Sequence, residues 1–303
     1  MKKVIFILGP TSAGKTAVAI ELAKKINGEI ISADSMQIYK GMDIITAKPT
    51  ITEQKEVKHY LIDVVSPSQE FNVAQYIEAV KEALSEIEKK NKQPVIVGGT
   101  GLYVSMLIDG LFAAPQVDEK IRDCLKAKVR EQGLAPLYKE LEKVDPKAAA
   151  KIHPHDEKRI VRALEVYEST NKPISSWQQE RCGIVKDFIL IGLNRDRSSL
   201  YERINNRVRD MFNEGVVSEI ETLWKTNQLT SKTALQSLGC KEIIGYLKGE
   251  YSLKMAEELL QRNTRHYAKR QLTWFRREKR IQWLDILEEE SKNEVVERIL
   301  TII

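Results

Sequence analysis

The first third of the chain alternates short apolar runs with longer segments of helical periodicity. The apolar runs cover Val4–Leu8, 29–34 and 94–99, and each has the length of a buried strand. Between them, 16–26 and 74–91 repeat apolar residues at every third or fourth position, as helices with one buried face do. Strands separated by helices in this way predict an α/β domain, with a parallel sheet covered by helices on both faces.

The first apolar run leads directly into LGPTSAGKT at residues 8–16, which matches the phosphate-binding pattern G-x-x-x-x-G-K-[ST]. Backbone N–H groups at the start of the next helix are expected to surround phosphate oxygens. Lys15 would neutralise their charge, and the Thr16 hydroxyl would reach a magnesium ion. The alternative is a strand-to-helix turn that needs glycine only for its shape. The motif predicts a phosphate site formed by Gly9, Pro10, Thr11, Ser12, Ala13, Gly14, Lys15 and Thr16.

The strand pattern stops after about residue 112 and returns in 185–196. Between these points, 117–133 and 156–170 have apolar residues at helical spacing with Lys and Arg between them, which is typical of amphipathic helices. The predicted fold class is therefore α/β, a P-loop NTPase-like parallel sheet flanked by helices, with a helical insertion domain. We expect the core domain to span 1–112 and 185–303 and the helical insertion domain to span 113–184.

Composition excludes several classes of protein. The chain has 303 residues, of which 42% are hydrophobic and 30% charged, and it lacks the run of about 20 apolar residues that a membrane span needs. The first residues carry no signal-peptide cleavage pattern, so we expect a cytoplasmic location and no membrane contact. Three widely spaced cysteines predict neither a zinc site nor a disulfide framework. The net charge is +5, but 262–280 alone carries +7, so a polyanion would bind there.

Two predicted strands end in residues that can carry chemistry. Asp34 follows the second strand, at the sheet edge where open α/β sheets bind ligands, and it can be a metal ligand or a general base. The spacing of Asp34 and Gln37 fits a helix capping box equally well. The strand ending in VGGTGLY brings the Thr100 hydroxyl and glycine-backed N–H groups, which can bond phosphate oxygens. A plain strand-end turn is the alternative at Thr100.

The segment DRSSLYERINNRVRDMF predicts a helix that begins with a capping box between Ser199 and Glu202. Arg203 and Arg207 lie one turn apart on it, which suits a diphosphate because each guanidinium can donate paired hydrogen bonds. Solvated side chains are the alternative for these arginines. The buried face of the helix is predicted to hold Leu200, Ile204, Val208 and Met211.

A second helix is predicted over 261–280, and its cations gather on one side. We call this side the basic rail; it comprises Arg262, Arg265, Lys269, Arg276 and Arg280. The opposite side is predicted to be buried and comprises Leu260, Tyr267, Trp274 and Ile281. A one-sided rail suits a nucleic-acid backbone, and a solvated face is the alternative.

Taken together, these segments resemble one family, the tRNA dimethylallyltransferases, also called tRNA isopentenyltransferases, of the bacterial type. The segments are GPTSAGKT, SADSMQIYKGMDI, AKP, HYLIDVVSP, VGGTGLY, RIVRALEVYE, GLNRDRSSLYERINNRV and KRQLTWFR. The resemblance implies transfer of a dimethylallyl group from dimethylallyl diphosphate to the N6 amine of an adenine adjacent to the anticodon in tRNA, with release of diphosphate. It implies Mg²⁺ as cofactor and the tRNA anticodon arm as partner, and we expect a monomer.

The resemblance also assigns roles to residues. Asp34 would be the general base, and Lys15, Thr100, Arg203 and Arg207 would complete the catalytic set. The helical insertion would hold the anticodon arm, and the helix that carries the basic rail would line the RNA side of a channel. The implied tRNA-binding residues are Asp34, Ser35, Met36, Gln37, Thr100, Arg122, Lys158, Arg159, Ile160, Val161, Arg162, Lys269, Arg270, Gln271 and Arg276.

Two positions depart from the family pattern. Ile45 stands where glycine is common, which questions the backbone shape of its loop, and Cys240 stands where an aromatic residue is frequent. Two other functions stay open from the sequence: a P-loop small-molecule kinase and a nucleotide-gated RNA-binding protein without transfer activity. Release of ADP from ATP in the presence of candidate acceptors would indicate the kinase.

Overall fold

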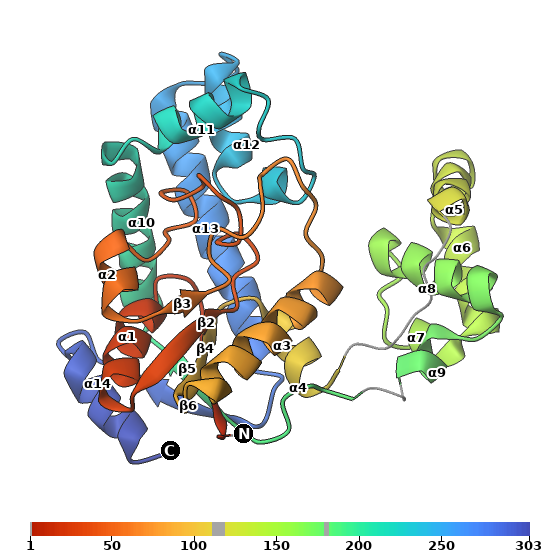
Figure 1. Ribbon diagram of the computed structural model, residues 1–303. Coiled ribbons are helices and arrows are strands. Elements are labelled where there is room, and N and C mark those ends of the chain that lie inside the picture. Colours follow the sequence, from red (N-terminus) through yellow and green to blue (C-terminus); the bar gives the residue numbers. More distant parts are fainter. Residues whose placement is uncertain (1, 111–118, 179–181) are drawn as a thin grey trace. The chain divides into compact units, whose positions relative to one another are not determined.

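The computed structural model describes residues 2–110, 119–178 and 182–303 (Figure 1). The chain divides into two compact units, one made of Met1–Met106 with Val185–Ile303 and the other of Leu107–Ile184. The domain boundary predicted at residue 112 lies outside the described residues. Each unit has its own hydrophobic core.

The first unit is built on a six-stranded sheet with the strand order β3-β2-β4-β1-β5-β6. Its strands are β1 (Val4–Leu8), β2 (Gly28–Ser32), β3 (His59–Tyr60), β4 (Gln93–Gly98), β5 (Phe188–Asn194) and β6 (Ile281–Asp285). All neighbouring strands are parallel; Ile5 of β1, for example, lies between Val95 of β4 and Ile189 of β5. β1 and β2 are buried along their whole length, as strands of a sheet covered on both faces are.

Helices cover both faces of this sheet. Ile5 and Ile7 of β1 share one hydrophobic core with Leu22 of α1 and Val296 of α14. Side chains alternate along a strand, so Phe6 points to the other face, where α3 contacts β2 and β4 (Figure 1). The α/β fold class predicted from the sequence is confirmed. The helices of this unit are α1 (Lys15–Lys25), α2 (Ile51–Glu56), α3 (Val73–Lys89), α4 (Gly101–Ile108), α10 (Arg197–Asn213), α11 (Val216–Lys225), the 3₁₀ turn Ala234–Gln236, α12 (Cys240–Leu247), α13 (Leu253–Phe275) and α14 (Lys292–Leu300).

Two edge strands were absent from the sequence prediction. β3 has only two residues, and β6, at the edge of the sheet, has only Ile281 and Leu284 buried, so neither forms an apolar run. α13 ends at Phe275, five residues before the predicted end of the second helix. Ile281 is therefore the first residue of β6 and does not continue a helical stripe.

Helix α10 begins three residues before its predicted start, at Arg197. The Asp196 carboxylate is the N-cap and accepts the backbone N–H groups of Ser198 and Ser199. The predicted capping box of Ser199 and Glu202 is therefore wrong, because Ser199 lies inside the first turn of the helix, of which Asp196 is the N-cap. The predicted buried face is confirmed, and it consists of Leu200, Ile204, Val208 and Met211.

The second unit is helical throughout its described residues. Its helices are α5 (Glu119–Gln132), α6 (Ala135–Val144), α7 (Pro146–Ala149), α8 (Glu157–Thr170) and α9 (Ile174–Trp177). Leu125, Leu141, Ile160 and Leu164 are fully buried and form the centre of its core. A separate core of this kind lets the helices fold around one another without the sheet.

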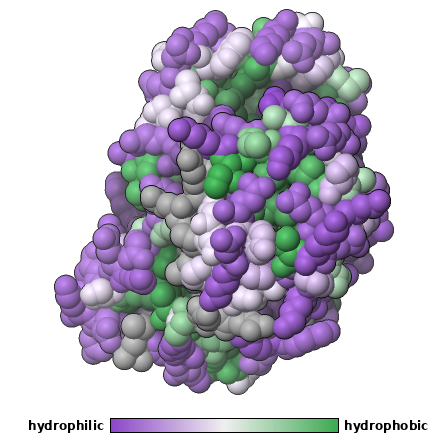
Figure 2. Space-filling view, turned by 90° about the vertical axis from the view of Figure 1, so that its right-hand side faces the viewer, coloured by the Kyte–Doolittle hydropathy of each residue, from purple (hydrophilic) through white to green (hydrophobic). Residues whose placement is uncertain are grey.

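None of the described helices combines the length and the apolar character that crossing a bilayer requires. On the face drawn in Figure 2, hydrophobic residues form separate patches among hydrophilic ones. The exposed large hydrophobic side chains, such as Ile51 and Leu287, come from distant parts of the chain.

Candidate active site

Neighbouring strand ends converge on one edge of the sheet. β1 leads into the phosphate loop, β2 into Asp34, β4 into Thr100 and β5 into Arg195. Because the strands are parallel, their carboxyl ends share this edge, where open sheets bind ligands. A cavity of about 320 Å³ opens here, and Lys15, Asp34 and Arg207 are among its lining residues.

The phosphate loop has a backbone that depends on glycine. Gly9 has a φ of 144°, and a Cβ there would lie 2.5 Å from the carbonyl oxygen of Leu193. Gly14 is the N-cap of α1 and provides no side-chain cap, so the first N–H groups of the helix remain available. The Ser12 hydroxyl oxygen is buried without a hydrogen-bond partner among the described residues. Free amides and an unpaired hydroxyl at a helix start fit a phosphate ligand.

The Lys15 ammonium group is held inside this loop. It donates a hydrogen bond to the Pro10 carbonyl oxygen at 2.6 Å. Burial lowers the pKa of Lys15 to about 8, while the Asp34 carboxylate raises this pKa and Arg207 lowers it further. A bound anion would favour the charged form of the ammonium group.

Three arginines from a distant part of the sequence donate hydrogen bonds to the phosphate loop. Arg203 and Arg207 come from α10, as the one-turn spacing suggested, and Arg195 follows the end of β5. Their hydrogen bonds join Arg195 to the Ala13 carbonyl (3.1 Å), Arg203 to the Ser12 carbonyl (3.0 Å) and Arg207 to the Thr11 hydroxyl (3.2 Å). Sequence analysis missed Arg195, although its place after a strand at the ligand edge was a usable signal.

The surroundings of Asp34 exclude one of its predicted roles. Residues 33–49 form turns and contain no helix, so the alternative of a helix capping box with Gln37 is wrong. The Asp34 Oδ1 atom instead accepts the N–H of Met36 at 2.9 Å, inside a turn. The Gln37 amide bonds elsewhere: it accepts from the Ser32 hydroxyl at 2.9 Å and donates to the Ala47 carbonyl at 3.3 Å.

Three tyrosines lie in the electrostatic field of Asp34. The rings of Tyr76 and Tyr103 stack with their centroids 3.8 Å apart, and Tyr267 lines the cavity. Burial raises the pKa of Tyr267 and of both stacked phenols, and the Asp34 carboxylate raises each pKa further because it disfavours a second negative charge. The phenols therefore stay neutral and can act as hydrogen-bond donors at neutral pH.

Two polar side chains join the strand ends to one another. The Thr100 hydroxyl accepts the N–H of Ser35 at 3.2 Å, which fixes the end of β4 against the Asp34 turn. Gln271 on α13 is buried, accepts the N–H of Thr11 and donates to the carbonyl of Gly99. The contact of Gln271 with RNA stays a prediction; its two internal bonds were not foreseen.

The basic rail is only partly continuous. Arg262, Lys269 and Arg276 are exposed, as expected. Arg265 is partly buried and donates to the Asn205 side chain at 2.5 Å, while Arg280 lies beyond the helix and binds Glu278. Only the exposed members are placed for an external polyanion.

The predicted burial of Trp274 is wrong. This side chain is 38% exposed, near the C-terminal end of α13. Its ring lies against α4, where a Cβ at Gly101 would come within 2.2 Å of it. Tyr267, on the same predicted face, is a partly exposed wall of the cavity.

In the second unit, Arg122 and Arg162 both pair with the buried Glu165 carboxylate, at 2.8 and 3.1 Å. Ile160 and Val161 pack inside the core of this unit. The charged side chains of the predicted RNA-binding segment reach the surface, and they are Lys158, Arg159 and Arg162. Their contact with RNA stays a prediction.

The two departures from the family pattern are accommodated. In residues 33–49 the left-handed backbone occurs at Gly41 and Ala47, so Ile45 does not need a glycine conformation. Cys240 is fully buried at the start of α12, and burial raises the pKa of its thiol. Its side chain therefore serves packing and does not reach the surface.

A phosphate loop, flanking arginines and a carboxylate at the edge of a parallel sheet define a P-loop-type phosphate-binding protein. The family model described as IPP transferase matches residues 37–278. The tRNA dimethylallyltransferase of Acetivibrio thermocellus is 48% identical over 302 residues, which cover 99% of this chain and 96% of the relative. That of Thermoanaerobacter sp. (strain X514) is 46% identical over 303 residues, 98% of this chain and 96% of the relative. The chain belongs to the IPP transferase family, and the resemblance inferred from its sequence is confirmed.

Solved structures give the same result. The tRNA isopentenylpyrophosphate transferase from Bacillus halodurans matches with a TM-score of 0.72 at 40% identity, over 99% of this chain and 96% of that one. A eukaryotic dimethylallyltransferase acting on tRNA matches with a TM-score of 0.86 at 31% identity, over 100% of this chain and 78% of that one. These comparisons favour the transferase over the kinase and the RNA-binding alternatives.

Proposed function

We propose that this protein transfers the dimethylallyl group of dimethylallyl diphosphate to the N6 amine of an adenine adjacent to the anticodon in tRNA, and releases diphosphate. One observation carries the proposal: Lys15 of the phosphate loop, Arg207 of α10 and the carboxylate of Asp34 line a single cavity. A donor diphosphate and an acceptor amine can therefore meet in one space. The relatives named tRNA dimethylallyltransferase support this choice of substrates.

The leaving group would occupy the phosphate-loop side. A second cavity adjoins the first and shares with it Lys15, Thr16 and Arg207, and Ser12 and Arg203 line it as well. Diphosphate bound between the loop and α10 would meet these cations and the free amides of α1. As the bond between the allylic carbon and the diphosphate oxygen breaks, negative charge grows on that oxygen, and fixed cations offset it.

The acceptor base would occupy the other side of the cavity, beside Asp34. The lone pair of an adenine amine is spread into the ring, so the amine is a poor nucleophile. A carboxylate that takes its proton while the new N–C bond forms assists the attack. The base must leave its stack to reach the donor. Apolar side chains of the same cavity suit the hydrocarbon tail, and they include Ile204, Val208 and Leu260.

The donor set fits magnesium. The Thr16 hydroxyl and the Asp34 carboxylate line the cavity, and within the described ranges no group of three or more His, Cys, Asp or Glu side chains would hold a metal alone. Magnesium at substrate phosphates commonly has few protein ligands and several phosphate or water oxygens. The Thr16 hydroxyl would hold the ion, which when bound supplies positive charge to the leaving diphosphate.

The RNA would be bound by exposed cations of both units. Lys269 and Arg276 of the basic rail would contact RNA phosphates, and Lys158 and Arg159 of the helical unit would contact the anticodon arm. We propose that the protein acts as a monomer.

The function is tested by incubating unmodified tRNA with the protein, dimethylallyl diphosphate and Mg²⁺, then digesting the RNA and analysing its nucleosides by mass spectrometry. We expect an adenosine that carries one dimethylallyl group, with one diphosphate released per transfer. ADP formed from ATP without this nucleoside would support the kinase. Binding of tRNA without either product would support the RNA-binding alternative.

A further inference from the structure

The loop of residues 34–49, which we call the wall loop, forms one side of the cavity. Its lining residues include Asp34, Met36, Gln37, Ile45 and Ala47. It contains no helix, so hydrogen bonds within a helix do not fix its backbone. Its shape therefore depends on partners outside regular structure.

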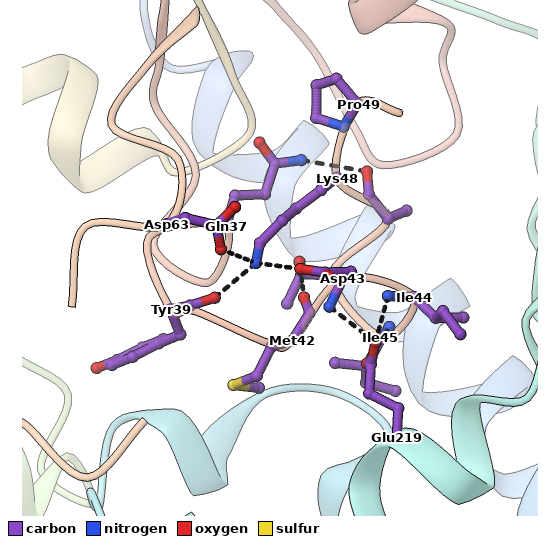
Figure 3. Close-up of polar contacts among 12 residues, drawn as sticks. Gln37, Tyr39, Met42, Asp43, Ile44, Ile45, Lys48, Pro49, Asp63 and Glu219 are labelled. Atoms are coloured by element: carbon purple, nitrogen blue, oxygen red, sulfur yellow. Dashed lines mark hydrogen bonds and ion pairs between the residues drawn. The ribbon is translucent and has the colours of Figure 1, made fainter. Parts of the chain in front are cut away.

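One of these partners is Glu219, in α11 and far along the chain. Its Oε2 atom accepts the N–H groups of Asp43 at 2.9 Å and Ile44 at 2.8 Å, and its Oε1 atom accepts that of Ile45 at 3.0 Å (Figure 3). One carboxylate thus binds three successive backbone amides. Hydrogen bonds to an ionised acceptor are stronger than bonds between neutral groups.

The two sides of this contact depend on each other, because Glu219 is partly buried. Burial raises the pKa of Glu219, and its three backbone hydrogen bonds lower it. A partly buried carboxylate is costly unless it is hydrogen-bonded, and a partly buried amide such as that of Ile45 is costly without an acceptor. Removing either side leaves the other unsatisfied.

A second anchor holds the same loop from the opposite direction. The Lys48 side chain is 3% exposed, and its ammonium group donates to the Tyr39 carbonyl at 2.6 Å. It also binds the carboxylates of Asp43 at 2.6 Å and Asp63 at 2.5 Å (Figure 3). Glu219 and Lys48 therefore fix the segment 43–48 between two charges.

The anchored segment leads directly to the cavity. Ile45 is buried and packs against the start of α12, where a Cβ at Gly239 would lie 2.2 Å from its Cδ1 atom. Two residues on, the Ala47 carbonyl accepts the Gln37 amide, which in turn accepts the Ser32 hydroxyl. A change at Glu219 reaches the wall of the cavity through these contacts.

We propose that Glu219 is a positioning residue of the transfer reaction, which fixes the wall loop so that the acceptor base is held against Asp34. This inference rests on the proposed function. Glu219 does not belong to the described residues that line the cavity, so it acts through the backbone of residues 43–45 and not by touching the substrate.

The first test needs no substrate. Amide hydrogen exchange is measured by mass spectrometry on a peptide covering 42–48, in the wild type, Glu219→Ala, Glu219→Gln and Glu221→Ala. Glu221 is the matched control, because it lies on the same helix and pairs with Lys225 at 2.5 Å. We expect exchange in Glu219→Ala to be faster by about tenfold or more, and in the control to match the wild type. If exchange is equal in all four proteins, the claim that Glu219 anchors the wall loop is overturned.

The second test is the single-turnover rate of transfer with both substrates saturating. We expect Glu219→Ala to be slower by roughly 10- to 100-fold, because small misplacements of reacting groups are costly. Glu219→Gln retains one carbonyl oxygen as an acceptor, so its transfer rate should decrease less than that of Glu219→Ala. The glutamine variant also provides the test if the alanine variant does not fold. Affinity for dimethylallyl diphosphate should be unchanged.

The outcomes separate the two proposals. An inactive wild type contradicts the proposed function and leaves the exchange result standing. An active wild type with Glu219→Ala as fast as Glu221→Ala overturns the positioning role.

Discussion

The side-chain oxygen of Gln271 lies 2.8 Å from the backbone nitrogen of Thr11 and accepts its hydrogen bond. The nitrogen of the same amide donates to the Gly99 carbonyl at 3.0 Å. One buried side chain of α13 thereby joins the phosphate loop to the end of β4. These two loops, which border the proposed donor site, are held in register by a residue 260 positions away from the first of them.

Replacing this amide should damage both stability and the phosphate site. Gln271→Met keeps the volume but leaves the Thr11 N–H and the Gly99 carbonyl without their partner, which should cost about 1–3 kcal/mol in the free energy of unfolding. Chemical denaturation measures this difference. Affinity for diphosphate, measured by calorimetry, should fall as well.

The matched control for this change is Gln261→Met on the same helix. Gln261 bonds only to the Glu257 side chain, at 3.0 Å, among the contacts seen for it. Its replacement should change stability by less than about 0.5 kcal/mol. Equal losses in the two variants would contradict the bridging role of Gln271.

Lys15 should make diphosphate binding depend on pH. Burial lowers its pKa from an ordinary value of 10.5 to about 8, so in the free protein the ammonium loses its proton as the pH rises through 8. An anion prefers the charged form, and its affinity should fall by about tenfold between pH 7 and pH 9. Titration calorimetry with diphosphate at several pH values measures this effect.

Lys15→Met is the control for this pH dependence. Methionine has no proton to lose, so the pH dependence of diphosphate affinity that remains comes from the titration of the ligand itself. Parallel pH profiles of diphosphate affinity for the two proteins would contradict the assignment.

The pH dependence of folding stability has the opposite sign to that of diphosphate binding. Because the folded pKa is lower than the unfolded one, the unfolded chain binds more protons between pH 8 and 10.5, and stability should rise with pH in that range.

The elements that could be predicted from the sequence are those with local signals. The phosphate loop follows from its glycines, Lys15 and the flanking strand and helix. Arg203 and Arg207 could be placed together because helical spacing fixes their relation, and α10 does bring both to the loop. Asp34 could be placed at the ligand edge because it follows a strand of a parallel sheet.

The rest depends on contacts between distant segments. Nothing local to Glu219 or Gln271 indicates that each fixes a loop at the opposite end of the chain. The periodicity of α13 correctly predicted burial of Leu260, whereas Tyr267 is a partly exposed residue of the cavity lining and Trp274 is 38% exposed. Helical spacing says which residues share a face, and only the tertiary contacts say what covers it.

The exposed part of the basic rail should control the salt dependence of tRNA binding. Lys269→Gln and Arg276→Gln should each reduce the slope of log affinity against log salt concentration by about one unit, because each removes one phosphate contact. Filter binding at several salt concentrations gives the slope. Affinity for dimethylallyl diphosphate should stay unchanged.

Arg280→Gln is the control for the rail, because this guanidinium binds Glu278 at 2.5 Å and lies beyond the end of α13. Its slope should change by less than that of either rail variant. If all three variants keep the wild-type slope, the rail is a solvated face.

The central claim is that Asp34 takes the proton of the acceptor amine. Asn at this position keeps the oxygen that accepts the Met36 N–H, so Asp34→Asn should leave the turn and the thermal midpoint of unfolding almost unchanged. It removes the basic carboxylate with little change in shape. The most direct measurement is the single-turnover rate of dimethylallyl transfer by Asp34→Asn and wild type, with tRNA and dimethylallyl diphosphate both saturating. We predict a decrease of roughly 10²- to 10⁴-fold in a folded variant; a folded Asp34→Asn protein that transfers at nearly the wild-type rate would contradict the account.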